Sequence, residues 1–183
     1  GIAAIYTGRL DIARAVGEWT RTIMNQQPNF PRQLFTSYSK ARGLITEFDQ
    51  IDEIRYVVNA NEARDQSFFQ VGVAGGFLTL LYQSTGETEW LQLAKKYMTF
   101  AEEANDFLFR IIRAGKVGWA ASTLYTATGE KLYKDMATRI GNNLIDLQFD
   151  EGFWSTVGGD KPTIVSTAER VVWMNEIYQS VGE

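Results

Sequence analysis

The sequence predicts an all-α protein, a single domain over residues 1–183 that is built from antiparallel helical hairpins. Two observations support this prediction. A seven-residue turn motif recurs along the chain, and apolar residues after it are spaced three and four apart, which places them on one face of a helix. No long alternating stretch competes as a strand, although residues 54–58 suit a short extended piece.

The repeated motif is a helix–helix turn. It reads Leu-Tyr-Gln-Ser-Thr-Gly-Glu at 81–87, Leu-Tyr-Thr-Ala-Thr-Gly-Glu at 124–130 and Ile-Tyr-Gln-Ser-Val-Gly-Glu at 177–183, with a fainter copy, Ile-Tyr-Thr-Gly-Arg, at 5–9. In each full copy the glycine suits the left-handed position that ends a helix. The glutamate then begins the next helix, where the helix dipole favours a negative charge.

The apolar stripes between these turns define the expected helices. After Glu130, for example, Tyr133, Met136, Ala137 and Ile140 follow the helical spacing. We expect helices over residues 9–27, 66–84, 87–104, 117–128, 130–148 and 167–180, and a long irregular loop from about 28 to 64. Three glycines in the second helix, Gly72, Gly75 and Gly76, are expected to allow close helix packing.

Composition limits the classes of partner. The 183 residues are 45% hydrophobic, enough for one domain with a sizeable core, and the net charge is −4 with both signs interspersed. No basic stripe or polybasic run is present, so neither nucleic acid nor a membrane surface is an expected partner. No apolar run approaches the ~18 residues of a membrane span. A soluble, cytoplasmic protein is the default expectation, and the compartment stays open.

The chain contains no cysteine and no histidine. Thiolate nucleophiles, histidine bases and zinc sites with cysteine or histidine ligands are therefore excluded. Any acid–base chemistry must use Asp, Glu, Lys or Tyr, with Arg as a fixed charge. We expect no metal and no cofactor.

Residues 148–154 read Gln-Phe-Asp-Glu-Gly-Phe-Trp. This pattern resembles the QW motif of squalene and oxidosqualene cyclases, in which the glutamine stacks on the tryptophan that starts the next helix. With a Thr-Gly-Glu turn before it, the segment is also similar to repeats of six-hairpin toroids that process sugars. The resemblance covers roughly residues 66–183. It implies an α/α-hairpin toroid, or part of one, with inner and outer helices, and stacking of Gln148 on Trp154.

The departures from these families matter equally. The Asp-x-Asp-Asp motif by which class II terpene cyclases protonate their substrate is missing. Protein prenyltransferases need a zinc held by cysteine and histidine, and acylglucosamine epimerases work through histidine, so both are excluded.

The candidate site follows from the connections. Three long ones, 28–65, 105–116 and 149–166, all lead to the same ends of helices, and function usually lies on long loops. The toroid resemblance implies that the helices entered there are the inner ring. We expect catalytic residues Asp65, Lys116 and Glu169 at the end of the array opposite Gly86 and Gly129. The expected substrate-binding residues are Arg64, Gln66, Phe69, Gln70, Trp119, Arg170 and Trp173.

Each candidate also has a structural interpretation. Asp65 can cap a helix, and residues 166–169 fit a capping box in which Glu169 reaches back to the Ser166 amide. Lys116 can be a solvated charge, and the two arginines can form surface ion pairs. The tryptophans can belong to the core.

Three functional hypotheses stay open. The leading one is a metal-independent biosynthetic enzyme, terpenoid-cyclase-like in fold, that cyclises or rearranges a small, largely apolar substrate in a helical cavity. The second is a carbohydrate-active hydrolase or lyase of six-hairpin fold that uses carboxylates such as Asp65 and Glu169. The third is a non-catalytic helical scaffold that binds a partner.

The repeat length gives one further expectation. At roughly 40 residues per hairpin, the chain supplies about half of a six-hairpin toroid. An open end of such an array exposes apolar surface. We therefore expect that surface to be covered, either by a second copy in a homodimer or by an N-terminal portion of the same chain.

Overall fold

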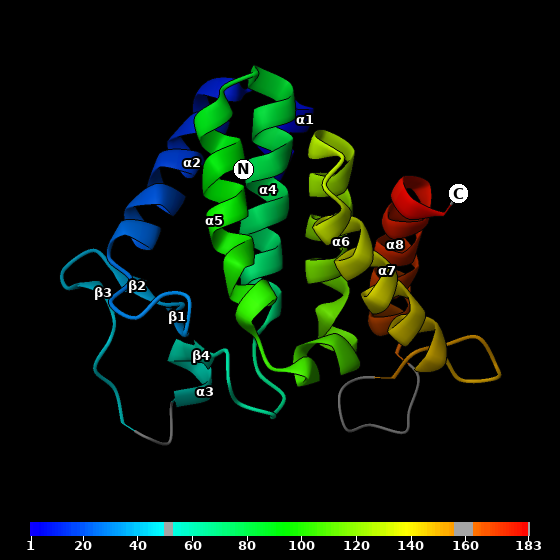
Figure 1. Cartoon of the computed structure of the whole chain (residues 1–183). Coiled ribbons are helices and arrows are strands. Elements are labelled where there is room, and N and C mark those ends of the chain that lie inside the picture. Colours follow the sequence, from blue (N-terminus) through cyan, green and yellow to red (C-terminus); the bar gives the residue numbers. More distant parts are fainter. Residues whose placement is uncertain (50–52, 156–162, 183) are drawn as a thin grey trace.

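The computed structural model describes residues 1–49, 53–155 and 163–182, which are mostly helical (Figure 1). The six expected helices are confirmed, with their ends shifted by a few residues. The α-helices are α1 (Ile2–Tyr6), α2 (Leu10–Asn25), α3 (Glu53–Tyr56), α4 (Phe69–Thr85), α5 (Thr88–Glu103), α6 (Gly115–Thr128), α7 (Lys131–Asp146) and α8 (Ile164–Val181). Two short 3₁₀ helices, η2 (Asp106–Arg110) and η3 (Ile112–Ala114), connect α5 to α6.

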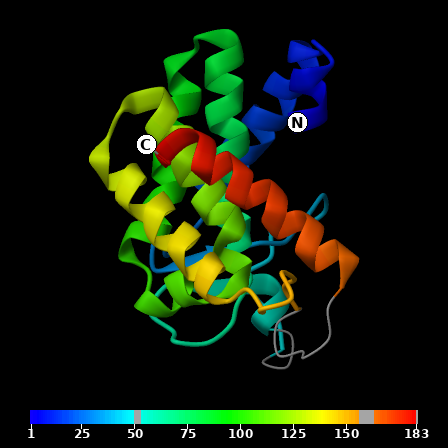
Figure 2. The same cartoon turned by 90° about the vertical axis from the view of Figure 1, so that its right-hand side faces the viewer.

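The long helices form a row of hairpins. Helix α4 packs against α6, and α6 packs against α8, while α5 lies on α4, and α7 lies on α6 and α8. Helices α1 and α2 lie at one end of the row and α8 at the other, which Figure 2 shows from the side of α8. The all-α prediction is therefore confirmed. The described helices do not close into a ring, so the toroid stays a prediction.

The segment before α4 is more ordered than expected. Strand β1 (Gln33–Phe35) pairs antiparallel with β4 (Val57–Asn59), and β2 (Tyr38–Ser39) pairs with β3 (Gly43–Leu44). The prediction of an irregular loop was therefore wrong, although the extended piece suggested for residues 54–58 overlaps β4 at Val57 and Val58. The directly opposed pair Leu34 and Val58 is 4% and 1% exposed, so burial against the core stabilises strands too short to show an alternating pattern.

The repeated turns have the same hydrogen bonds in both internal copies. Gly86 and Gly129 are left-handed, with φ of 72° and 70°, and each donates its N–H to the carbonyl of the tyrosine four residues earlier at 2.7 Å. The preceding threonines, Thr85 and Thr128, accept from the glutamate N–H at 3.3 and 3.2 Å. The motif is therefore one structural unit used twice.

The turn glutamates also connect neighbouring hairpins. Glu87 forms an ion pair with Arg14 of α2 at 2.9 Å and accepts a hydrogen bond from the Trp90 indole at 2.6 Å. Glu130 pairs with Lys95 of α5. Each glutamate thus binds a cation on the second helix of the preceding hairpin, a role beyond the helix-dipole effect that the sequence indicated.

The two characteristic residues of the QW-like segment each donate a hydrogen bond to a backbone carbonyl. The Trp154 side chain is 4% exposed and donates from Nε1 to the carbonyl of Leu144 at 2.7 Å. Gln148 is exposed and donates from Nε2 to the carbonyl of Gly152 at 2.9 Å. Both residues stabilise the end of α7, and their mutual stacking stays a prediction.

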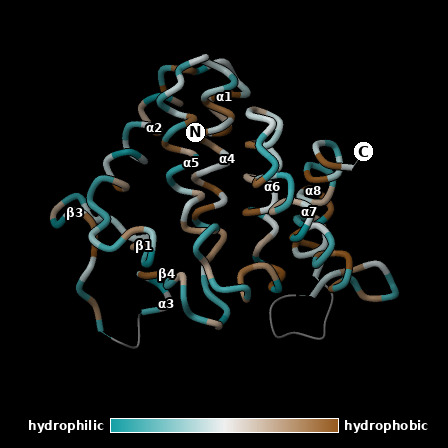
Figure 3. Tube along the Cα trace, viewed as in Figure 1, coloured by the Kyte–Doolittle hydropathy of each residue, from teal (hydrophilic) through white to brown (hydrophobic). Residues whose placement is uncertain are grey.

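Glycines set the distance between α4 and α6. A Cβ on Gly72 would lie 2.4 Å from the backbone of Lys116, and a Cβ on Gly76 would lie 2.3 Å from the Trp119 ring. Only a residue without a side chain permits this approach, so the expected packing role is confirmed. Figure 3 shows hydrophobic stretches along both helices.

We predict that Gly72→Ala lowers the free energy of unfolding by about 1–3 kcal/mol, because the added methyl group meets backbone that cannot move aside. The control is Gly75→Ala in the same helix, where the nearest atoms belong to the Met98 side chain at 3.0 Å. In Gly75→Ala the higher helix propensity of alanine stabilises the helix by up to ~1 kcal/mol, which offsets the crowding against Met98. Urea unfolding measures both, and equal effects would contradict the account.

Candidate functional site

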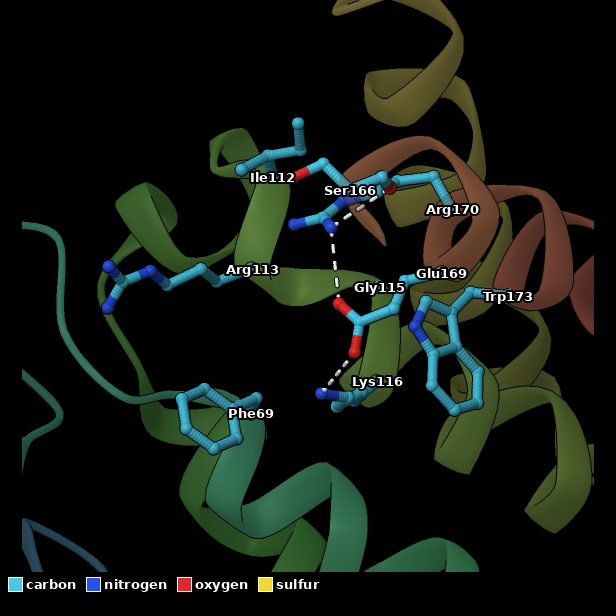
Figure 4. A pocket seen from close by; sticks show the side chains of 9 residues that line it. All are labelled: Phe69, Ile112, Arg113, Gly115, Lys116, Ser166, Glu169, Arg170 and Trp173. Atoms are coloured by element: carbon cyan, nitrogen blue, oxygen red, sulfur yellow. Dashed lines mark hydrogen bonds and ion pairs between the residues drawn. The ribbon is translucent and has the colours of Figure 1, made fainter. Parts of the chain in front are cut away.

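The three long connections bring the first turns of α4, α6 and α8 to one end of the array, while the Gly86 and Gly129 turns lie at the other (Figure 1). Lys116 and Glu169, with Asp65 close by, therefore lie at the end opposite Gly86 and Gly129, and their role in a functional site stays a prediction. A cavity of about 230 Å³ lies between these first turns. Its lining residues are Phe69, Ile112, Arg113, Gly115, Lys116, Ser166, Glu169, Arg170 and Trp173 (Figure 4), and we call it the basic pocket.

One carboxylate and two cations form its centre. Glu169 Oε1 lies 3.0 Å from Lys116 Nζ, and Glu169 Oε2 lies 3.2 Å from Arg170 Nη1. The same Nη1 donates to the Ser166 carbonyl at 3.1 Å. Helices α6 and α8, far apart in sequence, are thus joined near their N-terminal ends by a charged network.

Arg170 is unusually enclosed for a cation. It is 8% exposed, and its Nε has no hydrogen-bond partner among residues 1–49, 53–155 and 163–182. Burial lowers the pKa of its guanidinium, with Glu169 acting in the opposite direction and Arg113 in the same one. Figure 4 shows the guanidinium projecting between Ser166 and Glu169 on the side that faces Arg113. A buried donor without a partner favours an acceptor, above all an anion.

Aromatic rings form the wall around Lys116. Its Nζ lies 5.2 Å from the centroid of Phe69 and 5.9 Å from that of Trp173. Trp173 packs in turn on Trp119, with ring centroids 5.3 Å apart. Trp119 is 6% exposed and does not line the pocket, so it acts as a support for Trp173.

Asp65 lies beside the pocket and not among its lining residues. Its Oδ2 is 3.6 Å from Arg113 Nε, and its Oδ1 is buried without a hydrogen-bond partner in the described part of the chain. Burial raises the pKa of Asp65, and the Arg113 charge partly opposes that rise. The cation Arg113 therefore links Asp65 to the pocket.

This shift gives a pH prediction. Folded Asp65 holds its proton more tightly than in the unfolded chain, so the free energy of unfolding falls as pH rises from the ordinary Asp value of 3.8 through the raised pKa. We expect Asp65→Asn to gain stability relative to the parent between about pH 3 and pH 7. The exposed residue Asp106 provides the control Asp106→Asn. Urea melts at several pH values measure both, and a relative loss by Asp65→Asn over this range would contradict the assignment.

Three predicted binding residues lie elsewhere. Arg64 pairs with Glu53 and Glu62 in the segment before α4. Gln66 is 1% exposed and bonds to both backbone groups of Asn59. The expectation that Arg64 and Gln66 line the pocket was wrong, because both side chains hold together the segment before α4. Gln70 lines a different, apolar cavity.

The two capping interpretations were also wrong. Helix α4 begins after Phe68 with no side-chain cap, three residues beyond Asp65. Helix α8 begins at Ile164, and the cap is Thr163, whose side chain accepts from the Ser166 N–H at 3.0 Å. The longer α8 places Glu169 past its first turn, where the side chain reaches Lys116 instead of the Ser166 amide.

Sequence reasoning missed Arg113. It considered only the first residues of the expected helices, and Arg113 belongs to η3, immediately before α6. The signal was present in the spacing, since Arg113 and Lys116 are three residues apart and share one face if the helical conformation continues backwards. Ser166 contributes its backbone carbonyl, which carries no sequence signal.

No protein-family model, curated protein sequence or solved structure matches the chain. Among residues 1–49, 53–155 and 163–182, no group of three or more Asp or Glu residues is arranged to hold a metal ion. Within the same ranges, no helix is long and apolar enough to cross a membrane.

Proposed function

We propose that the chain is a carbohydrate-active protein that binds an acidic sugar, such as a uronic acid, in the basic pocket. The observation that carries the proposal is the buried, incompletely bonded guanidinium of Arg170, beside two further cations and two aromatic rings. The site has three cations, Arg113, Lys116 and Arg170. It has two carboxylates, Glu169 and the neighbouring Asp65, so one positive charge is left over. An arginine binds a carboxylate through two parallel hydrogen bonds, and a hydroxylated ring packs well on an aromatic face.

The pocket chemistry favours a lyase over a hydrolase. A hydrolase needs two carboxylates on opposite sides of the scissile bond, whereas among the residues that the structure describes Glu169 is the one acidic residue that lines the pocket. In an elimination, Arg170 and Arg113 neutralise the substrate carboxylate, and Glu169 accepts the proton from the adjacent carbon. The released electron pair forms a carbon–carbon double bond, the bond to the leaving oxygen breaks, and Lys116 protonates that oxygen.

The terpenoid-cyclase hypothesis has weaker support. It needs an apolar cavity, and the largely apolar one between α2 and α4 is lined by Trp19, Phe35, Phe77 and Tyr97 among others. Among the described residues, its lining contains no Asp or Glu to protonate an apolar substrate. A cyclase would therefore lack the acid that begins the reaction.

We predict that glucuronate binds and that glucose, its neutral counterpart, binds at least tenfold more weakly. Arg170→Gln should weaken glucuronate binding by about ten- to hundredfold, the equivalent of one charge-assisted hydrogen bond. Arg139→Gln, on the exposed face of α7, is the matched control. Calorimetric titration measures the affinities. Equal binding of the two sugars, or equal losses in both variants, would refute the proposal.

The elimination step has its own test within this proposal. An oligomer of uronic acid should yield an unsaturated product with new ultraviolet absorbance, and Glu169→Gln should abolish that product while glucuronate binding persists. Binding without product would leave an acidic-sugar binding protein and would rule out the lyase.

A further inference from the structure

Another cavity, of about 620 Å³, lies beside the paired strands β1 and β4 and has no role in the proposed function. Two segments line it, residues 29–33, which end at the first residue of β1, and residues 59–62, which begin at the last residue of β4. The lining residues are Asn29, Phe30, Pro31, Arg32, Gln33, Asn59, Asn61 and Glu62. Half of them carry a side-chain amide, so we call this cavity the amide pocket.

The two segments are held in place by backbone hydrogen bonds. The Ala60 N–H donates to the Arg32 carbonyl at 2.9 Å, and the Ala60 carbonyl accepts from the Asn105 N–H at 2.7 Å. Gln66 Oε1 accepts from the Asn59 N–H at 2.7 Å, and Gln66 Nε2 donates to the Asn59 carbonyl at 3.0 Å. Ala60 and Gln66 are both 1% exposed. Because these groups are already bonded and buried, the pocket keeps its shape without a ligand.

Three of the amides form a row of hydrogen bonds with one direction. Asn29 Nδ2 donates to Gln33 Oε1 at 2.8 Å, and Gln33 Nε2 donates to Asn59 Oδ1 at 2.8 Å. Asn59 Nδ2 then donates to Glu53 Oε1 at 3.3 Å, and Arg64 forms an ion pair with the same carboxylate at 3.2 Å. An ionised carboxylate only accepts hydrogen bonds, so Glu53 fixes the direction in which each amide of the row points.

The amides keep hydrogen-bonding capacity for a ligand. A side-chain amide has two donor hydrogens and an oxygen that accepts two hydrogen bonds, and the row uses one hydrogen of each member. Asn29 Oδ1 and the amide of Asn61 have no partner among the residues that the structure describes, and both side chains are exposed. Donors and acceptors side by side match hydroxyl groups, which both donate and accept.

The other lining residues favour a neutral ligand with an apolar face. Among the described residues, Arg32 and Glu62 are the charged ones of the lining, so it has no net charge. The half-buried ring of Phe30 forms an apolar wall and packs on Tyr97 and Phe100, with ring centroids 6.5 and 6.4 Å apart. A neutral sugar combines hydroxyl groups with a C–H face, and both match this lining.

The amide pocket lies at the same end of the array as the basic pocket (Figure 1). Glu62 lines the amide pocket, and three residues later Asp65 forms an ion pair with Arg113 of the basic pocket. Three residues span at most about 11 Å, so a short segment connects the two pockets. The choice of a sugar over another neutral, hydroxylated ligand rests on the proposed function of the basic pocket.

We propose that the amide pocket is a second binding site, which takes a neutral sugar unit. The amides of Asn29 and Asn61 bind its hydroxyl groups, and the ring of Phe30 contacts its C–H face. The row of hydrogen bonds that ends at Glu53 holds the amides in position before the sugar arrives.

The test is nitrogen NMR of the isotope-labelled protein, in which each side-chain amide gives its own signals. The probes are glucose, galactose, mannose, xylose and N-acetylglucosamine, each added alone to about 50 mM. We predict that at least one of them shifts the side-chain signals of Asn29, Gln33 and Asn61. The expected affinity is millimolar, as suits a single sugar unit that forms a few hydrogen bonds. The signals of Asn142, an exposed residue of α7, should stay in place.

Variants show whether the shifts report on the pocket. Asn29→Ala and Asn61→Ala should each weaken the binding about three- to tenfold, the equivalent of one neutral hydrogen bond. Asn142→Ala is the matched control, and circular dichroism verifies that each variant keeps its fold. Arg170→Gln should leave the binding unchanged, because Arg170 lines the basic pocket and not the amide pocket. Equal losses in Asn142→Ala and the two pocket variants would overturn the proposal.

The two proposals can fail separately. Amide signals that respond to none of the neutral sugars would overturn this inference, even where glucuronate binds in the basic pocket. A larger shift with glucuronate than with every neutral sugar would assign the amide pocket to acidic sugars, and a shift with adenosine alone would assign it to a nucleobase; either result overturns the inference. Shifts with a neutral sugar in a protein that does not bind glucuronate would uphold the amide pocket and refute the acidic-sugar proposal.

Discussion

The close approach of α4 to α6 is the constraint on which the rest of the structure depends. Gly72 lets α4 contact the backbone of Lys116, in the first turn of α6. That contact brings Phe69 and Lys116, from separate hairpins, into one wall of the basic pocket. Helix α8 then completes the pocket through the ion pair between Glu169 and Lys116. A wider spacing between α4 and α6 would separate these first turns and open the pocket to solvent.

The repeated turn explains why all the chemistry lies at one end. Each Thr-Gly-Glu turn is minimal and is fully used by its own hydrogen bonds and by the ion pairs of Glu87 and Glu130. The long connections leave the opposite end variable, and the positive ends of three helix dipoles point toward it. Arg113, Lys116 and Arg170 add to this positive field, which favours an anionic ligand over an apolar one.

The sequence predicted the helices and the end of the array at which Asp65, Lys116 and Glu169 meet, because both depend on local signals, namely apolar spacing and the left-handed glycines. It could not show that Phe69 lines the basic pocket whereas Gln66 does not, since the helix begins three residues later than its pattern suggests. It also could not show that Gln66 is buried against Asn59 through a strand pairing between distant segments. The pairing of Asp65 with Arg113 likewise depends on tertiary packing, which no local pattern records.

A crystal structure of the protein grown with glucuronate tests the central claim most directly. The account predicts the sugar in the basic pocket, with its carboxylate within about 3 Å of the Arg170 guanidinium and its ring on Trp173. Arg170 and Glu169 would keep the positions they have without the ligand, because the packing of α4 on α6 already fixes the pocket. Glucuronate bound elsewhere, or a basic pocket that stays empty at saturating glucuronate, would contradict it.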